Sequence, residues 1–176
     1  MIVRTLTTFY TDLPDDAVET AEGDFLQWPG RNVVQLIADL LRAIGWVPED
    51  PYDLEERGWE LHARCGDRMI SMRFSILEEV ILYISDRTPD RTWYFKRKPP
   101  GPEFVGMLVG LDAAMKANGS FRDVLWFTPE GYDRQTETGS PAPVDVDEEV
   151  RHLGDAGPLT RPGERPAEGL PGGEQQ

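Results

Sequence analysis

The chain has 176 residues, which is enough for one domain with a substantial apolar core and too few for two domains of typical size. Its formal charge is −14, from 18 basic and 32 acidic residues, which argues against binding to the phosphate backbone of a nucleic acid. The single cysteine, Cys65, excludes an intramolecular disulfide and a zinc site built from several cysteines.

The first part of the chain predicts a strand, an acidic loop and a helix. Residues 1–10 favour a β-strand, and the helix is expected after "WPGRN", where Asn32 has Gln35 at the capping-box spacing. The acids of the loop are Asp12, Asp15, Asp16, Glu19, Glu22 and Asp24. The apolar stripe of the helix is Val33, Leu36, Ile37, Leu40, Leu41 and Ile44, and Gly45 ends it.

A β-hairpin follows, with Gly66 and Asp67 as its two-residue turn. In this register the apolar pairs on one face are Ala63–Ile70, Leu61–Met72 and Trp59–Phe74, and the polar pairs on the other are His62–Ser71 and Glu60–Arg73. A slip of one residue would scramble both sets, so the agreement predicts the register as well as the hairpin.

The next strand, residues 80–86, is apolar on both alternations. A two-residue turn at Glu78 and Glu79 directs Ile81 and Tyr83 to the core, and a three-residue loop directs Val80, Leu82 and Ile84 there. A fourth strand, "TWYFK", has the same two-sided pattern. Large apolar side chains are therefore expected on the sheet face where the hairpin is polar, and they predict a partner-binding surface. Its residues are Val80, Leu82, Tyr83, Ile84, Trp93 and Phe95.

A second helix over 103–117 and a last strand, "DVLWFT", complete the expected domain, residues 1–129. The predicted fold class is α+β: a mainly antiparallel sheet with two helices packed on one face, a two-layer sandwich. Residues 130–176 are rich in Pro, Gly and acids and predict a disordered tail. Within it Val146, Val150 and Leu153 have the spacing of a short amphipathic helix near 145–153.

Signals of catalysis are weak. His62 lies opposite Ser71, an arrangement in which the histidine could act as a base and the serine as a nucleophile. The sequence implies no orienting carboxylate and no oxyanion hole for them. The same face also holds Arg64 and Arg73, which form an alternative ligand face for a small anion. No cofactor motif and no metal-ligand spacing is found. The basic and aromatic segment 87–98 is the type that holds single-stranded nucleic acid, but the overall acidity makes this partner unfavourable.

The sequence therefore predicts a non-enzymatic protein-binding module that binds a protein partner or a second copy of itself. Two kinds of module fit: an immunity or antitoxin-like protein that neutralises a basic partner, and an adaptor similar in helix and strand order to secretion chaperones. The alternative is a small enzyme or a regulator that responds to an anionic ligand on the polar sheet face. No basic and apolar leader and no apolar run near the roughly 18 residues of a membrane span occurs, which predicts a soluble, cytoplasmic protein.

Overall fold

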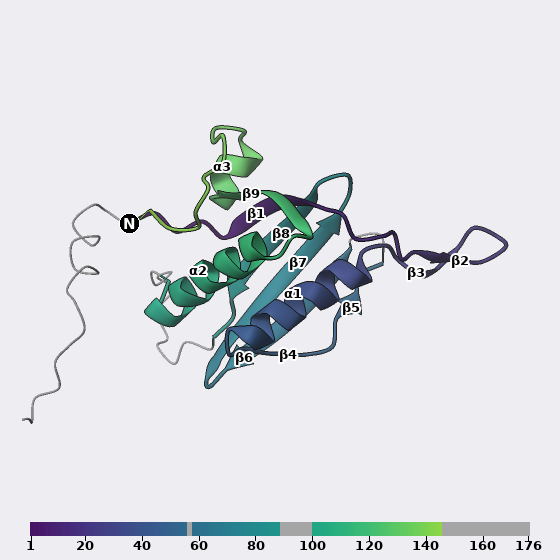
Figure 1. Cartoon of the computed structure of the whole chain (residues 1–176), viewed down its shortest axis with the longest axis horizontal. Coiled ribbons are helices and arrows are strands. Elements are labelled where there is room, and N and C mark those ends of the chain that lie inside the picture. The colour runs from purple at the N-terminus through teal and green to yellow at the C-terminus, as the bar shows by residue number, and fades with distance from the viewer. Residues whose placement is uncertain (56–57, 89–99, 146–176) are drawn as a thin grey trace, which may run out of the picture. The chain divides into compact units, whose positions relative to one another are not determined.

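Antiparallel pairing organises the computed structural model, which describes residues 1–55, 58–88 and 100–145 (Figure 1). The strands are β1 (Leu6–Thr11), β2 (Val18–Glu19), β3 (Phe25–Gln27), β4 (Val47–Pro48), β5 (Tyr52–Asp53), β6 (Trp59–Cys65), β7 (Arg68–Ile76), β8 (Val80–Asp86) and β9 (Phe121–Phe127). The helices are α1 (Arg31–Ala43), α2 (Pro102–Ala117) and α3 (Pro129–Asp133). The α+β class and the antiparallel sheet are confirmed.

Within the described residues, the main sheet has seven strands in the order β4-β6-β7-β8-β1-β9, with β5 also paired to β6. The β6–β7 hairpin has the predicted register throughout, including Trp59 opposite Phe74 and His62 opposite Ser71. Between β7 and β8 the loop has three residues, because Ile76 pairs with Val80. This is the second of the two predicted alternatives, and it turns Val80, Leu82 and Ile84 toward the same face as Phe74 and Met72.

Helices α1 and α2 lie side by side over that face of the sheet (Figure 1). Their buried residues include Val33, Ile37 and Leu41 of α1 and Phe104, Leu108, Leu111 and Met115 of α2. Trp126 of β9 is buried under α2 and donates its indole N–H to Asp112 at 2.7 Å. One two-layer core therefore shelters the apolar alternation of every long strand.

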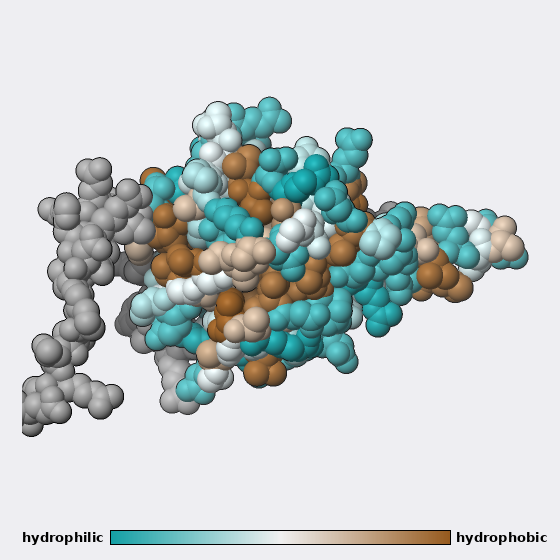
Figure 2. All heavy atoms as spheres, viewed as in Figure 1, coloured by the Kyte–Doolittle hydropathy of each residue, from teal (hydrophilic) through white to brown (hydrophobic). Residues whose placement is uncertain are grey.

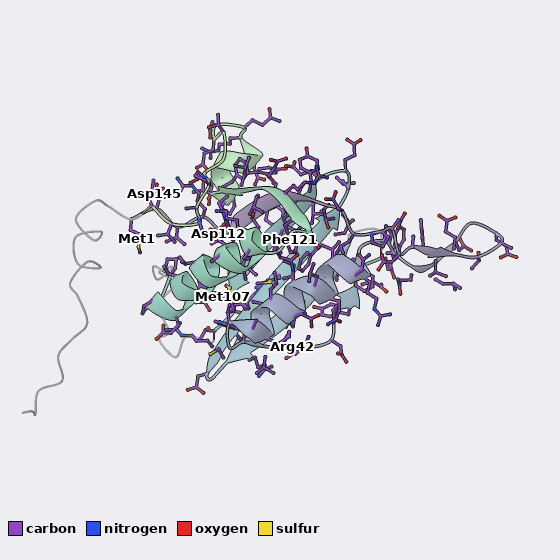
Figure 3. All side chains as sticks on the ribbon, in the orientation of Figure 1. Met1, Arg42, Met107, Asp112, Phe121 and Asp145 are labelled. Atoms are coloured by element: carbon purple, nitrogen blue, oxygen red, sulfur yellow. The ribbon has the colours of Figure 1, made fainter. Side chains whose placement is uncertain are left out.

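The folded body extends beyond the predicted boundary at residue 129. Its compact unit runs from Met1 to Asp145, and residues 130–145, predicted as part of a disordered tail, pack on the body. Trp126 and Ser140 exchange two backbone hydrogen bonds of 2.8 Å, and Asp145 binds Arg4 at 2.8 Å and lies beside Met1 (Figure 3). The predicted helix near 145–153 and the remaining tail fall on residues 146–176, outside the described residues.

Helix α1 begins one residue before the predicted cap, and its capping group comes from the acidic loop. The carboxylate of Asp16 accepts the backbone N–H groups of Gly30 at 2.6 Å and Asn32 at 2.7 Å. The Asn32 side chain instead donates to the carbonyl of Pro14 at 2.5 Å. Gly30 has a φ of 94°, and an added Cβ would lie 2.5 Å from the side chain of Ile76. The expectation that Asn32 caps the helix is therefore wrong, because the helix begins at Arg31 and a carboxylate distant in sequence accepts N–H groups at its N-terminus.

Replacing Asp16 with alanine is expected to lower the free energy of unfolding by about 1–2 kcal/mol, because two N–H groups at a helix N-terminus lose their acceptor. Urea denaturation measures the change. The matched control is Asp24→Ala, an exposed acid of the same acidic segment, which is expected to change stability by less than about 0.5 kcal/mol. Equal effects of the two substitutions would contradict the capping role.

Candidate functional site

Three of the predicted partner-binding residues lie in the core. Val80, Leu82 and Ile84 are 1%, 0% and 3% exposed, so the expectation that they form a surface is wrong. The three-residue loop directs them to the helix layer, and β8 is a central strand between β7 and β1. Tyr83 lies on the opposite face and is half-buried. Trp93 and Phe95 fall outside the described residues.

The outer face, opposite the helices, changes from apolar to polar across the sheet. One row of directly paired residues shows this change: Phe127, Leu6, Tyr83, Arg73, Glu60 and Tyr52, in strand order from β9 to β5. Its apolar half is covered by the chain itself. Tyr132 of α3 packs edge-on against Phe127, with ring centroids 5.2 Å apart. Burial, and then the nearby Asp133 and Tyr132, raise the pKa of Tyr83.

The polar half of the outer face is centred on the buried carboxylate of Glu60, which accepts hydrogen bonds from three side chains. Ser71 Oγ donates at 2.7 Å, Arg73 Nε at 3.1 Å, and His62 Nε2 lies 2.9 Å away. Burial alone would raise the pKa of Glu60, but these three bonds outweigh it and lower the pKa to about 2. Glu60 is therefore a charged carboxylate at the centre of a group of three hydrogen-bonding side chains on the outer sheet face.

Further contacts surround the Glu60 carboxylate. His62 Nδ1 lies 3.7 Å from Glu49 Oε2, and Arg64 Nε donates to Glu49 Oε1 at 3.2 Å. The hydroxyl of Tyr52 lies 3.4 Å from His62 Nε2, and burial followed by the Glu60 carboxylate raises the pKa of Tyr52. The structure thus brings together all four residues of the alternative ligand face and adds Glu49, Tyr52 and Glu60 to them.

The chemistry available to this cluster is limited. Ser71 is buried, and its hydroxyl proton points to Glu60 and not to His62, so the geometry of a base-activated nucleophile is not formed. Arg64 and Arg73 each have a carboxylate partner, so an anion would compete with Glu49 and Glu60 for them. Among the described residues, no group of three His, Cys, Asp or Glu side chains is arranged to hold a metal ion. The cluster therefore has the properties of a structural polar network.

An exposed apolar surface occurs elsewhere, on a hairpin that lies outside the main sheet. Strands β2 and β3 pair only with each other within the described chain, and they extend away from the body (Figure 1). We call residues 18–27 the arm. Leu26 is 72% exposed, Val18 46% and Phe25 37%, and Figure 2 shows hydrophobic residues among hydrophilic ones along it. The sequence analysis predicts an acidic loop here and no strands. The pattern that could have predicted them is a β-favouring residue, Val18 or Phe25, on each side of a turn that contains Gly23.

The arm is ordered by its own contacts and anchored at its base. Thr20 closes the turn, since its N–H donates to the carbonyl of Asp24 at 2.8 Å. Phe25 stacks on Trp28 with ring centroids 4.3 Å apart. At the base, Gln27 Nε2 donates to the carbonyl of Asp16 at 2.7 Å, and Asp16 in turn caps α1. The arm is therefore held at a defined position while Leu26 remains largely exposed and Val18 and Phe25 remain partly exposed.

Among the described residues, none of the helices has the length and hydropathy that crossing a lipid bilayer requires. Searches of protein-family models, of curated proteins and of solved structures find no match to this chain.

Proposed function

We propose that this chain is a non-enzymatic protein-binding module whose contact with its partner is made by the arm. The observation that supports this is the exposure of Val18, Phe25 and Leu26 on a hairpin whose strands do not pair with the main sheet. The contacts of Thr20, Gln27 and Trp28 already order the arm, so a partner that covers it loses little free energy to ordering it.

The energetics favour binding through these side chains. Fully burying an exposed Leu side chain contributes about 1.5–3 kcal/mol, and Val18 and Phe25, which are 46% and 37% exposed, contribute less. Three such residues within one short hairpin supply the apolar centre that protein contacts require, and the acids around them supply the polar rim. The residues first predicted for the contact, Val80, Leu82 and Ile84, are replaced in this proposal by those of the arm.

An immunity or antitoxin-like role fits this arrangement better than a chaperone-like adaptor role. An immunity protein recognises one folded partner with a preformed surface, and the anchored arm is such a surface. The net charge of −14 favours a basic partner. The alternative of an enzyme or of an anion-responsive regulator is less well supported, because both arginines of the polar face are already paired.

The test compares Leu26→Asp with Val47→Asp in the full chain. Leu26 and Val47 are 72% and 69% exposed, so neither substitution is expected to shift the thermal unfolding midpoint by more than a few degrees. Affinity purification with quantitative mass spectrometry is expected to recover proteins with the wild-type chain and Val47→Asp that Leu26→Asp does not retain. Recovery of the same proteins by all three forms would exclude the arm as the contact.

A further inference from the structure

Resting on the proposed function, we infer that the partner surface extends from the arm across the adjoining end of the main sheet, and that it fits a basic protein surface with exposed apolar residues. Leu77 extends the apolar contact beyond the arm, since it is 70% exposed in the loop between β7 and β8. The charges around these apolar side chains determine the kind of partner.

Contacts at the base of the arm bring this end together. Gly30, which follows the arm, lies against Ile76, the last residue before the β7–β8 loop. The carbonyl of Pro29 accepts the indole N–H of Trp59 at 2.8 Å, and Trp59 pairs with Asp53 of β5. The arm, the β7–β8 loop and the region of β5 therefore lie at the same end of the sheet, which is also where β1 ends and β9 begins.

Acidic residues dominate these segments. Residues 12–31, 52–55, 77–79 and 121–123 contain eleven acids and two arginines. The acids are Asp12, Asp15, Asp16, Glu19, Glu22, Asp24, Asp53, Glu55, Glu78, Glu79 and Asp123. Of the arginines, Arg122 is ion-paired with Asp12 at 2.7 Å and Arg31 is hydrogen-bonded to Gln27. The negative charge at this end is therefore only slightly compensated within these segments.

The opposite end of the sheet differs, because several of its acids are paired with arginines. Arg68 binds Glu103 at 3.0 Å and lies 3.6 Å from Asp86, Arg64 binds Glu49, and Arg42 binds Asp39. A basic partner is thus attracted to one end of the molecule, the end that carries the exposed Leu26 and Leu77. Such an asymmetric field accelerates the encounter, and the apolar contacts then slow dissociation.

The same charges argue against a second copy of this chain as the occupant. Two copies that met through this end would bring both sets of eleven acids together. Like charges opposed across a contact repel each other, so a symmetric dimer is disfavoured. The proposal therefore commits to a basic protein.

The experiment selects binders from a phage-displayed library of random peptides with the full chain as the target. We expect the selected peptides to be enriched in Lys and Arg around one or two large apolar residues. Their affinities are measured for the wild type, for Leu26→Asp, for Glu78→Gln/Glu79→Gln, and for the matched control Asp39→Asn/Asp67→Asn. Both double variants remove two negative charges, but Asp39 and Asp67 lie on α1 and in the β6–β7 turn.

We expect Leu26→Asp to weaken binding at least tenfold, Glu78→Gln/Glu79→Gln to weaken it about fivefold through slower association, and the control to change it less than twofold. Selected peptides without an excess of basic residues, but dependent on Leu26, would overturn the inferred partner class and leave the arm as the contact. Basic peptides that depend on Leu26 but not on Glu78 and Glu79 would overturn the extended surface. Peptides that bind Leu26→Asp with unchanged affinity would overturn the proposed function itself.

Discussion

Replacing Leu82 with alanine will lower the free energy of unfolding by about 2–5 kcal/mol, the largest effect expected from a single truncation in β8. Leu82 is fully buried, and its strand neighbours are Thr7 of β1 and Phe74 of β7. Truncation leaves a cavity between the sheet and the helices that these neighbours close only partly. Urea denaturation of the full chain measures the loss.

The matched control is Leu77→Ala, the same chemical change at a residue that is 70% exposed and five positions earlier in the chain. It is expected to change stability by less than about 0.5 kcal/mol. The charged variant Leu82→Asp should prevent folding, because an unpaired carboxylate cannot be accommodated in the core. A folded Leu82→Asp protein with native stability would restore Leu82 to the surface and contradict the three-residue β7–β8 loop.

The contrast between the β6–β7 hairpin and β8 shows what the sequence determines locally. In the hairpin a slip of one residue would put Trp59, Leu61 and Ala63 opposite mostly polar residues, so the pattern and the two-residue turn predict the register correctly. In β8 both alternations are apolar, and the two possible loops differ by one residue. The choice depends on what covers each face, which is set by α1 and α2 on one side and by residues 128–145 on the other.

Residues 130–145 show the limit of an argument from composition. Their glycines, prolines and acids predict a segment that cannot bury enough apolar area to fold. The segment nevertheless docks, because its partners are distant in sequence: Val144 pairs with Val3, Ser140 with Trp126, and Asp145 with Arg4. The hydrogen bonds from Thr128 lower the pKa of Glu137, which adds a further contact. None of these pairings can be inferred from the residues that neighbour the segment in the sequence.

The polar cluster was predictable from the sequence only where it depends on the hairpin register. The hairpin register placed His62, Ser71 and Arg73 on one face and paired Glu60 with Arg73, as observed. The burial of Glu60 was not predictable, because it depends on β5, a two-residue strand that pairs Tyr52 with Glu60. Glu60, predicted as one member of a polar cross-strand pair, is a buried carboxylate with three donors.

The Glu60 carboxylate is expected to make the stability of the protein depend on pH in the acidic range. Its pKa is lowered in the folded protein from the ordinary value of 4.5 to about 2. A group with a lowered folded pKa contributes its full stability above the unfolded pKa and loses it as the pH falls through the folded pKa. The difference corresponds to about 3 kcal/mol, present at neutral pH and lost between about pH 5 and pH 2.

Comparison with Glu60→Gln isolates this contribution from other carboxylates. Asp145 also has a lowered pKa, because of its hydrogen bond to Arg4, so the wild-type profile alone contains more than one group. At pH 7 we expect Glu60→Gln to be less stable than the wild type by about 2–3 kcal/mol, since an amide replaces a charged acceptor. The two free energies of unfolding, measured by urea titration at intervals down to pH 2.5, should converge as the pH falls.

The control for this experiment is Glu22→Gln, which removes an exposed carboxylate from the turn of the arm. Its curve should stay parallel to that of the wild type over the whole range. If the Glu60→Gln curve also stays parallel, the carboxylate has no lowered pKa, and the three hydrogen bonds from Ser71, His62 and Arg73 do not stabilise its charged form. If Glu60→Gln is less stable at pH 7 but the two curves do not converge, the loss comes from packing alone. The loss of a charge interaction depends on the protonation of Glu60, whereas a loss of packing does not depend on pH.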